Sequence, residues 1–197
     1  MWDQRYREQG YAFGVEPNDF LRESAAHIPA GRVLSLAEGE GRNAVYLASL
    51  GYAVTGVDQS TVGLGKARAL AGGRSLVIDT QVADLADYAI EPETWDGIVS
   101  IFAHLPTAVR RRLYASVIVG LRPGGVFILE AYGPAQPTFG TGGPSDLDLL
   151  PPLAELRDEL DGLEFVIARE LERPVVEGRY HTGQASVVQI VGRKPAQ

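Results

Sequence analysis

The sequence contains no cysteine, so disulfide bonds, thiolate metal ligands and a covalent cysteine intermediate are all excluded. No spacing of histidines and carboxylates typical of a metal site appears either, and we expect no catalytic metal. Positive charge is scarce: 18 lysines and arginines face 25 aspartates and glutamates, which gives a formal net charge of −7. A general nucleic-acid-binding protein usually carries a basic face, so we expect no nucleic-acid partner.

Long hydrophobic runs are also missing, and no secretory leader is recognisable. We therefore expect no membrane partner and predict a cytoplasmic location. With 197 residues, of which 45% are hydrophobic, the chain is long enough to bury one substantial core. We predict a single domain over residues 1–197, with a leading helical segment at 1–28 and a core at 29–197.

The stretch 31–60 has the pattern of a strand, a turn, a helix and a second strand. A short apolar run at 32–36 is ended by glycines, residues 43–50 are apolar at helical spacing, and 52–57 is a second apolar run. This succession is typical of one half of a nucleotide-binding sheet, in which a ligand lies at the turn after the first strand.

The residues of that turn favour one kind of ligand. Gly39 and Gly41 tolerate positive φ and leave the backbone open to a ligand, and Asp58 ends the second strand where an acidic side chain takes ribose hydroxyls. A dinucleotide fingerprint needs a third glycine after Gly41, which is absent. Glu38 and Glu40 would repel a pyrophosphate, whereas S-adenosylmethionine carries two cationic groups and no phosphate. The glycine spacing alone is a weak signal, because any α/β protein can carry it.

The rest of the sequence continues the alternation of strands and helices. Strands are predicted at 76–83, 98–102 and 126–131, and helices at 19–27, 61–70, 107–121 and 149–160. Two β-rich runs at the end, 163–176 and 180–193, are joined by a short turn containing glycine. They predict a hairpin, which makes the last strand antiparallel to the others. The fold class is therefore α/β, with a mostly parallel sheet.

The stretch VLSLAEGEGRNAVYLASLGYAVTGVDQS resembles motif I and the following acidic strand end of class I S-adenosylmethionine-dependent methyltransferases, in particular their tellurite-resistance branch. Further similar segments are WDQRYREQGYAFGVEPNDFL, WDGIVSIFAHLP, LRPGGVFILEAY and EGRYHTGQASVVQIVGRK, so the resemblance covers nearly the whole chain. It implies a three-layer, doubly wound, Rossmann-like sheet of seven strands in the order 3-2-1-4-5-7-6. It also implies S-adenosylmethionine as cofactor and direct SN2 transfer of its methyl group to a small-molecule acceptor.

The resemblance also implies which residues hold the cofactor. Asp84 would bond the adenine amino group, and Leu85 would pack on the adenine ring. The other expected contacts lie in the turn and at the end of the second strand: Glu38, Gly39, Gly41, Asn43, Asp58, Gln59 and Ser60. In the family the opening segment folds over the cofactor as a lid. For residues 1–14 the alternative is an aromatic staple packed on the body of the domain.

Motif I departs from the family pattern at two positions. The usual carboxylate is Ser35 here, and the first glycine is Ala37. We hypothesise that Glu38 supplies the missing charge for the cofactor's ammonium group, so that Glu38→Gln weakens cofactor binding while Ser35→Ala has little effect. One alternative is a non-catalytic protein that binds S-adenosylmethionine. Another is a nicotinamide-dependent oxidoreductase, which the missing third glycine and the acidic turn both disfavour.

The acceptor is less constrained than the cofactor. A thiolate or an oxyanion of tellurium or selenium needs no general base, whereas a neutral hydroxyl does. His104, at the end of the fourth strand, and His181, near the hairpin turn, are the candidate catalytic residues. Tyr11, Tyr132 and Arg179 are the candidate substrate contacts. We favour a small anionic, thiol or oxyanion acceptor, and a monomer or weak homodimer.

Overall fold

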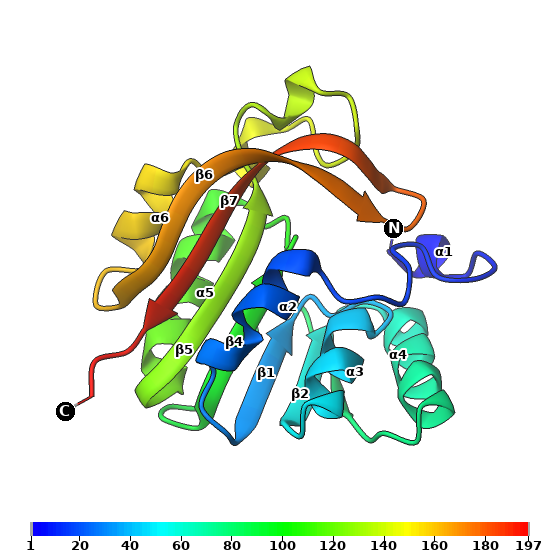
Figure 1. The fold of residues 1–197 in the computed structure, drawn as a ribbon, viewed down its shortest axis with the longest axis horizontal. Helices are drawn as coiled ribbons and strands as arrows, with labels where there is room; N and C mark the ends of the chain where they lie inside the picture. Colours follow the sequence, from blue (N-terminus) through cyan, green and yellow to red (C-terminus); the bar gives the residue numbers. More distant parts are fainter. Residues whose placement is uncertain (1, 197) are drawn as a thin grey trace.

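The computed structural model describes residues 2–196, which form a seven-stranded sheet covered by helices on both faces (Figure 1). The strand order is β3-β2-β1-β4-β5-β7-β6, and β7 alone runs antiparallel to the other six strands. The predicted topology and the predicted antiparallel strand are therefore confirmed. The strands are β1 (Arg32–Leu36), β2 (Ala53–Asp58), β3 (Asp79–Val82), β4 (Trp95–Ile101), β5 (Leu121–Tyr132), β6 (Glu164–Glu177) and β7 (His181–Arg193).

Two separate apolar clusters hold the helices to the sheet. One cluster joins the sheet to α2, α3 and α4, and the other joins it to α5 and α6, so the fold has three layers. The helices are α1 (Trp2–Tyr6), α2 (Asp19–Ser24), α3 (Arg42–Ser49), α4 (Thr61–Gly73), α5 (Thr107–Gly120) and α6 (Leu153–Glu159), with short 3₁₀ turns at Ala25–His27, Gln136–Thr138 and Leu147–Leu149. Among the described helices, none is long and apolar enough to cross a bilayer.

Several element boundaries differ from the predicted ones. Helix α4 runs through Gly73, because the two glycines predicted to end it are followed by Ser75, which takes the left-handed conformation instead. Strand β3 is four residues long, half the predicted run, and lies at the edge of the sheet. Strand β5 begins at Leu121 rather than after the Pro-Gly-Gly sequence, since its first residue already pairs with Trp95 across an irregular register.

The sheet topology brings the predicted functional residues together at the carboxyl-terminal ends of the parallel strands, which we call the site edge of the sheet. The chain leaves β1, β2, β3 and β4 at this edge, where ligands bind in open α/β sheets. Because β7 is antiparallel, it begins at the same edge, so the hairpin turn between β6 and β7 also lies there. The opening segment, residues 2–14, packs against this turn: the backbone N–H of Arg179 donates to the carbonyl of Ala12 at 2.9 Å.

Candidate active site

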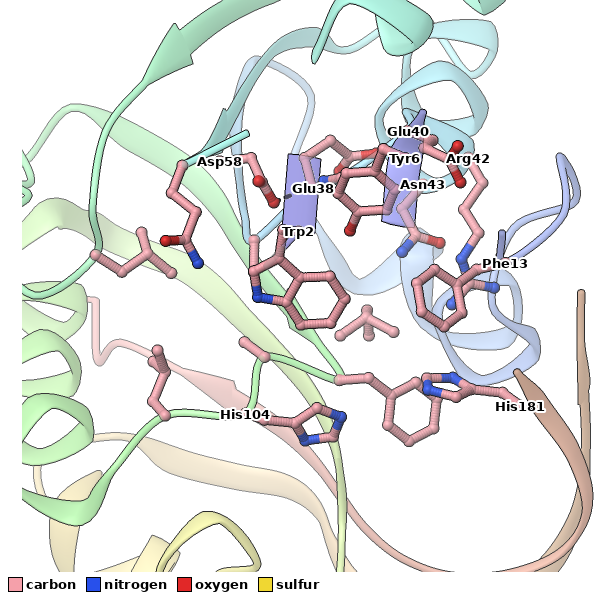
Figure 2. A pocket seen from close by; sticks show the side chains of 18 of the residues that line it. Trp2, Tyr6, Phe13, Glu38, Glu40, Arg42, Asn43, Asp58, His104 and His181 are labelled. Atoms are coloured by element: carbon pink, nitrogen blue, oxygen red, sulfur yellow. Dashed lines mark hydrogen bonds between the residues drawn. The ribbon is translucent and has the colours of Figure 1, made fainter. Parts of the chain in front are cut away.

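A pocket that opens to solvent lies at these strand ends, beneath the opening segment. Most of the predicted site residues line it: Glu38, Gly39, Asn43, Asp58, Gln59, Asp84, Leu85, His104 and His181. Figure 2 shows the carboxylates on one side and the two imidazoles on the opposite side. We call the side formed by Glu38, Glu40, Asp58 and Asp84 the acidic half, and the side formed by Phe13, Phe102, His104 and His181 the imidazole half.

Asp58 at the end of β2 is held by backbone groups. The N–H of Gly39 donates to its Oδ2 at 2.9 Å, and the N–H of Ser60 donates to its Oδ1 at 2.8 Å. Burial raises the pKa of Asp58 above its ordinary value, although both hydrogen bonds oppose this. Each carboxylate oxygen has a second lone pair, so Asp58 can accept further hydrogen bonds from a ligand while it fixes the turn.

Glu38 is buried at the pocket wall, and both of its carboxylate oxygens accept hydrogen bonds. The hydroxyl of Ser35 donates to Oε2, and the backbone N–H of Ala44, in the first turn of α3, donates to Oε1 at 2.9 Å. Burial raises the pKa of Glu38 to about 7, against these bonds and the charge of Arg42. The hypothesis treated Ser35 and Glu38 as separate sites, but the structure links them, so Ser35→Ala also disturbs the Glu38 carboxylate.

Glu40 connects the turn to the opening segment. Its Oε2 accepts a hydrogen bond from the backbone N–H of Ala12 at 2.6 Å, and its Oε1 pairs with the Lys66 ammonium at 2.8 Å. The same ammonium also donates to the carbonyls of Glu8 and Gly10. Lys66 is thereby paired with groups of the turn and of the opening segment and ties the two together.

Two predicted cofactor residues have other roles. Gly41 does not line the pocket; a Cβ there would lie 2.6 Å from the Cα of Ala67, so this glycine allows close packing of α3 on α4. Ser60 does not line the pocket either, because its hydroxyl accepts the N–H of Gly63 as the N-cap of α4 and contacts Asp3. Gly39 does line the pocket, with φ +62°.

The aromatic side chains of the opening segment cover the pocket. Trp2 stacks on Tyr6 with 5.7 Å between ring centroids, and Tyr6 lies over the turn, close to Gly39. Trp2 also approaches Phe13, whose ring is 4.6 Å from that of His181 (Figure 2). The segment therefore lies where a lid would lie, while its mobility stays a prediction.

His104 sits in the imidazole half without a charged partner. Its ring stacks on Tyr132 at 5.6 Å with an interplanar angle of 6°. Burial, together with the nearby His181, lowers the pKa of His104 to about 3, so its imidazole is neutral at any ordinary pH. His104 can therefore act as a neutral hydrogen-bonding group toward an acceptor, but it is a poor proton acceptor.

His181 is 7% exposed and lies among aromatic rings. Phe102 is 5.1 Å away and Tyr132 is 5.3 Å away, both edge-on. Its Nδ1 is 3.5 Å from Oε2 of Glu177, the last residue of β6. Among the two predicted catalytic histidines, His181 is thus the one with a carboxylate beside it.

The three predicted substrate contacts do not line the pocket. Tyr132 is buried behind His104 and supports it from β5. Tyr11 lies in the opening segment under the Lys66 ammonium. Arg179 pairs with Glu8 at 3.1 Å and is half exposed, so it fastens the opening segment to the hairpin. The placement gives no support to Arg179 as a substrate contact, and this role stays a prediction.

Several residues that line the pocket were not among the predicted site residues, including Trp2, Phe13, Arg42 and Phe102, and Glu177 beside His181 was not predicted either. The aromatic richness of the opening segment was a signal for Trp2 and Phe13. Arg42 begins α3, and its guanidinium donates through Nη2 to Glu177 at 2.6 Å. That contact depends on how the hairpin packs on α3, for which the local sequence carries no signal.

Comparison with known proteins agrees with this picture. Residues 33–125 match the family described as a methyltransferase domain. No curated protein matches the sequence. The fold is similar to that of the protein of echinomycin biosynthesis that converts a disulfide bond into a thioacetal group, with a TM-score of 0.78 and 22% identity over 98% of this chain and 92% of that one.

Two further solved structures share the fold. TehB from Haemophilus influenzae has a TM-score of 0.74 and 22% identity over 89% of this chain and 61% of that one. A S-adenosylmethionine-dependent methyltransferase from Methanosarcina mazei has a TM-score of 0.70 and 18% identity, with 88% and 97% covered. The match of residues 33–125 agrees with the predicted methyltransferase class, and the neighbours confirm the predicted fold.

Proposed function

We propose that the chain is a small-molecule methyltransferase that binds S-adenosylmethionine in the acidic half of its pocket and a neutral acceptor in the imidazole half. The observation that carries this proposal is that one pocket joins a carboxylate-rich wall to a wall of aromatic rings and imidazoles. When bound, S-adenosylmethionine supplies the methyl group and takes the electron pair of the broken carbon–sulfur bond onto its sulfur.

The side chains of the acidic half fit this cofactor. Asp58 keeps free lone pairs for ribose hydroxyls, and Asp84 lies at the end of β3 for the adenine amino group. Glu38 offers the carboxylate that motif I lacks at Ser35. Lys66, by contrast, is already paired with Glu40, which disfavours the pyrophosphate of a nicotinamide cofactor.

The imidazole half favours an acceptor without charge. His104 is neutral, Arg42 is paired with Glu177, and Arg179 lies outside the pocket. Phe13 and Phe102 add apolar surface on which a flat or apolar acceptor can pack. These contacts support a neutral hydroxyl or thiol compound rather than the oxyanion favoured by the sequence, and a tellurite-resistance role is therefore the weaker candidate.

The first test is calorimetric titration with S-adenosylmethionine, S-adenosylhomocysteine and NADH. We expect micromolar affinity for the first two ligands and no binding of NADH. An acceptor screen follows, with phenols, thiols, tellurite and selenite, read by mass spectrometry of the methylated product. Binding without turnover on every acceptor would support the non-catalytic alternative, and binding of NADH instead would overturn the cofactor assignment.

The remaining expectations concern the setting of the reaction. We propose a small-molecule acceptor as the only partner, with no role for nucleic acid or membrane, a cytoplasmic location and a monomer or weak homodimer. Light scattering of the purified protein checks the oligomeric state.

A further inference from the structure

Glu177 and His181 face each other across the hairpin at the edge of the pocket. Glu177 ends β6, His181 begins β7, and the two are register partners in the antiparallel ladder. Side chains of such partners lie on the same face of the sheet, here the face toward α3 and the pocket. The hairpin therefore fixes a carboxylate beside an imidazole through backbone geometry.

The Glu177 carboxylate is buried and held in place. Arg42 donates from Nη2 to its Oε2 at 2.6 Å, and Asn18 donates from Nδ2 to its Oε1 at 2.7 Å. Burial by itself would raise the pKa of Glu177, but His181, Arg42 and Asn18 together lower it to about 2. Glu177 is thus a carboxylate throughout the ordinary pH range, and Arg42 supports it from α3.

The two ring nitrogens of His181 have different surroundings. Nδ1 is buried, makes no hydrogen bond within the described residues, and lies 3.5 Å from Glu177 Oε2. Nε2 is not among the buried unpaired atoms and has no hydrogen-bond partner in residues 2–196, so it reaches the open space of the pocket. Hydrogen bonds of this kind are often long in the free protein and shorten when a ligand binds.

We propose that Glu177 is a positioning residue that accepts the Nδ1–H of His181 and keeps the lone pair on Nε2, where it takes the proton of a neutral hydroxyl or thiol acceptor. This inference rests on the proposed function and names its substrate class. The acceptor's O–H or S–H bond breaks, its electron pair stays on the oxygen or sulfur that bonds the methyl carbon, and the proton moves to Nε2. The imidazolium that forms lies beside the Glu177 charge and returns the proton to solvent.

His104 cannot replace His181 in this role. It is neutral because of burial, and within the described residues its Nδ1 is buried without a hydrogen-bond partner. Its stacking on Tyr132 holds the ring beside the acceptor's place, 6.4 Å from His181 between ring centroids. We assign it the binding of the acceptor, and the removal of the proton to His181.

The test is long-range ¹H–¹⁵N NMR of the imidazole rings, which distinguishes the two neutral tautomers. The chain has only three histidines, so His27→Gln and His104→Gln variants identify the His181 signals. In the wild type we expect His181 to carry its proton on Nδ1 in roughly tenfold excess, because a bond to a carboxylate holds it there. In Glu177→Gln we expect this excess to be lost.

Glu130→Gln is the matched control. Glu130 is also buried, also accepts Nδ2 of Asn18, and pairs with Arg173 at 2.6 Å, but it does not touch His181. We expect it to leave the His181 tautomer unchanged. A wild-type His181 protonated on Nε2, or the same tautomer ratio in wild type and Glu177→Gln, would overturn the proposal, and the wild-type spectrum decides even if the variant does not fold.

Calorimetry with S-adenosylhomocysteine separates this inference from the proposed function. We expect Glu177→Gln to bind it within about threefold of wild type, because Glu177 lies outside the acidic half. If the His181 tautomer depends on Glu177 but the protein does not bind S-adenosylhomocysteine, the proposed function is refuted and the pairing of Glu177 with His181 is kept. If the protein binds S-adenosylhomocysteine but the His181 tautomer does not depend on Glu177, only the pairing of Glu177 with His181 is refuted.

Discussion

The two halves of the pocket are built in different ways. In the acidic half, Glu38 and Asp58 are fixed by backbone N–H groups of the same β1-α3-β2 stretch. In the imidazole half, His104 comes from the end of β4 and His181 from the start of β7, and Phe13 reaches them from the opening segment. The core of the acidic half, Glu38 and Asp58, is thus local in sequence, whereas the imidazole half is assembled from distant segments and carries little charge.

This difference matches the two tasks of a methyl transfer. A donor that bears positive charge is bound by preorganised carboxylates, whose backbone partners keep them in place before the ligand arrives. An acceptor must be enclosed away from water and, if neutral, must lose a proton. This contrast between the two halves holds only if carboxylates of the acidic half are needed to bind the cofactor and cations near the imidazole half are not needed to bind the acceptor. Both conditions can be tested.

The largest expected effect concerns the charge of Glu38. Its pKa is about 7 in the folded chain and 4.5 ordinarily, so between these values the folded chain holds a proton that the unfolded chain has released. The free energy of unfolding therefore falls as pH rises from about 4.5 to about 7, by roughly 3 kcal/mol from this group. Glu38→Gln should remove this dependence, as urea unfolding of both proteins at pH 4.5 and pH 8 would measure.

Ser35→Ala provides the matched control for that measurement. The Ser35 hydroxyl lowers the pKa of Glu38, so its removal should keep the pH dependence or make it steeper. If Glu38→Gln and wild type lost stability equally between the two pH values, Glu38 would not be the buried group that titrates, and its carboxyl group would be ionised at a lower pH than we infer.

The second effect is on cofactor affinity. Asp58→Ala removes a carboxylate that accepts two backbone hydrogen bonds at the turn, so the turn loosens and a ribose contact is lost. We expect S-adenosylhomocysteine to bind roughly 30-fold more weakly, about 2 kcal/mol, by calorimetry. Asp87→Ala is the control, because Asp87 is an exposed carboxylate on the loop after β3 that does not line the pocket. Equal losses in both variants would point to general charge rather than to this site.

The sequence predicted the acidic half better than the imidazole half, and the reason is physical. The periodicity of 32–58 specifies a strand, helix and strand, and this alone brings Asp58 beside Gly39. No local pattern brings Arg42 to Glu177, since that contact needs both the hairpin register and the packing of the sheet on α3. The seven-strand order came from the family resemblance rather than from periodicity.

Glycine and serine were harder to interpret. The sequence indicates that position 41 requires a residue without a Cβ. It does not show whether a ligand or Ala67 approaches that position, because glycine is needed in both cases. Ser60 is likewise a suitable N-cap and a suitable ligand for a hydroxyl, and the structure shows the cap. Such positions become clear only when the neighbouring helix is in place.

A third, smaller effect tests the imidazole half. Arg179→Ala removes the cation nearest the hairpin tip, which pairs with Glu8 in an exposed position. Because Arg179 does not line the pocket, we expect the KM of any acceptor found by the screen to change less than about threefold. A larger rise in KM, specific to anionic acceptors such as tellurite, would show that charge attraction operates in this half and would break the comparison.

The smallest effect is at Ala37, where the chain turns from β1 into the acidic half. Ala37 has φ +52°, a left-handed conformation that a Cβ disfavours by about 1–2 kcal/mol. Glycine relieves that strain but adds freedom to the unfolded chain, so Ala37→Gly should raise the free energy of unfolding by only about 0.5 kcal/mol. Ala48→Gly, inside α3, should instead lower it by about 1 kcal/mol in the same urea titration. A loss of stability in both variants would mean that the Ala37 side chain packs well enough to outweigh its strained backbone, so that the turn is held by the alanine itself as well as by Glu38 and Asp58.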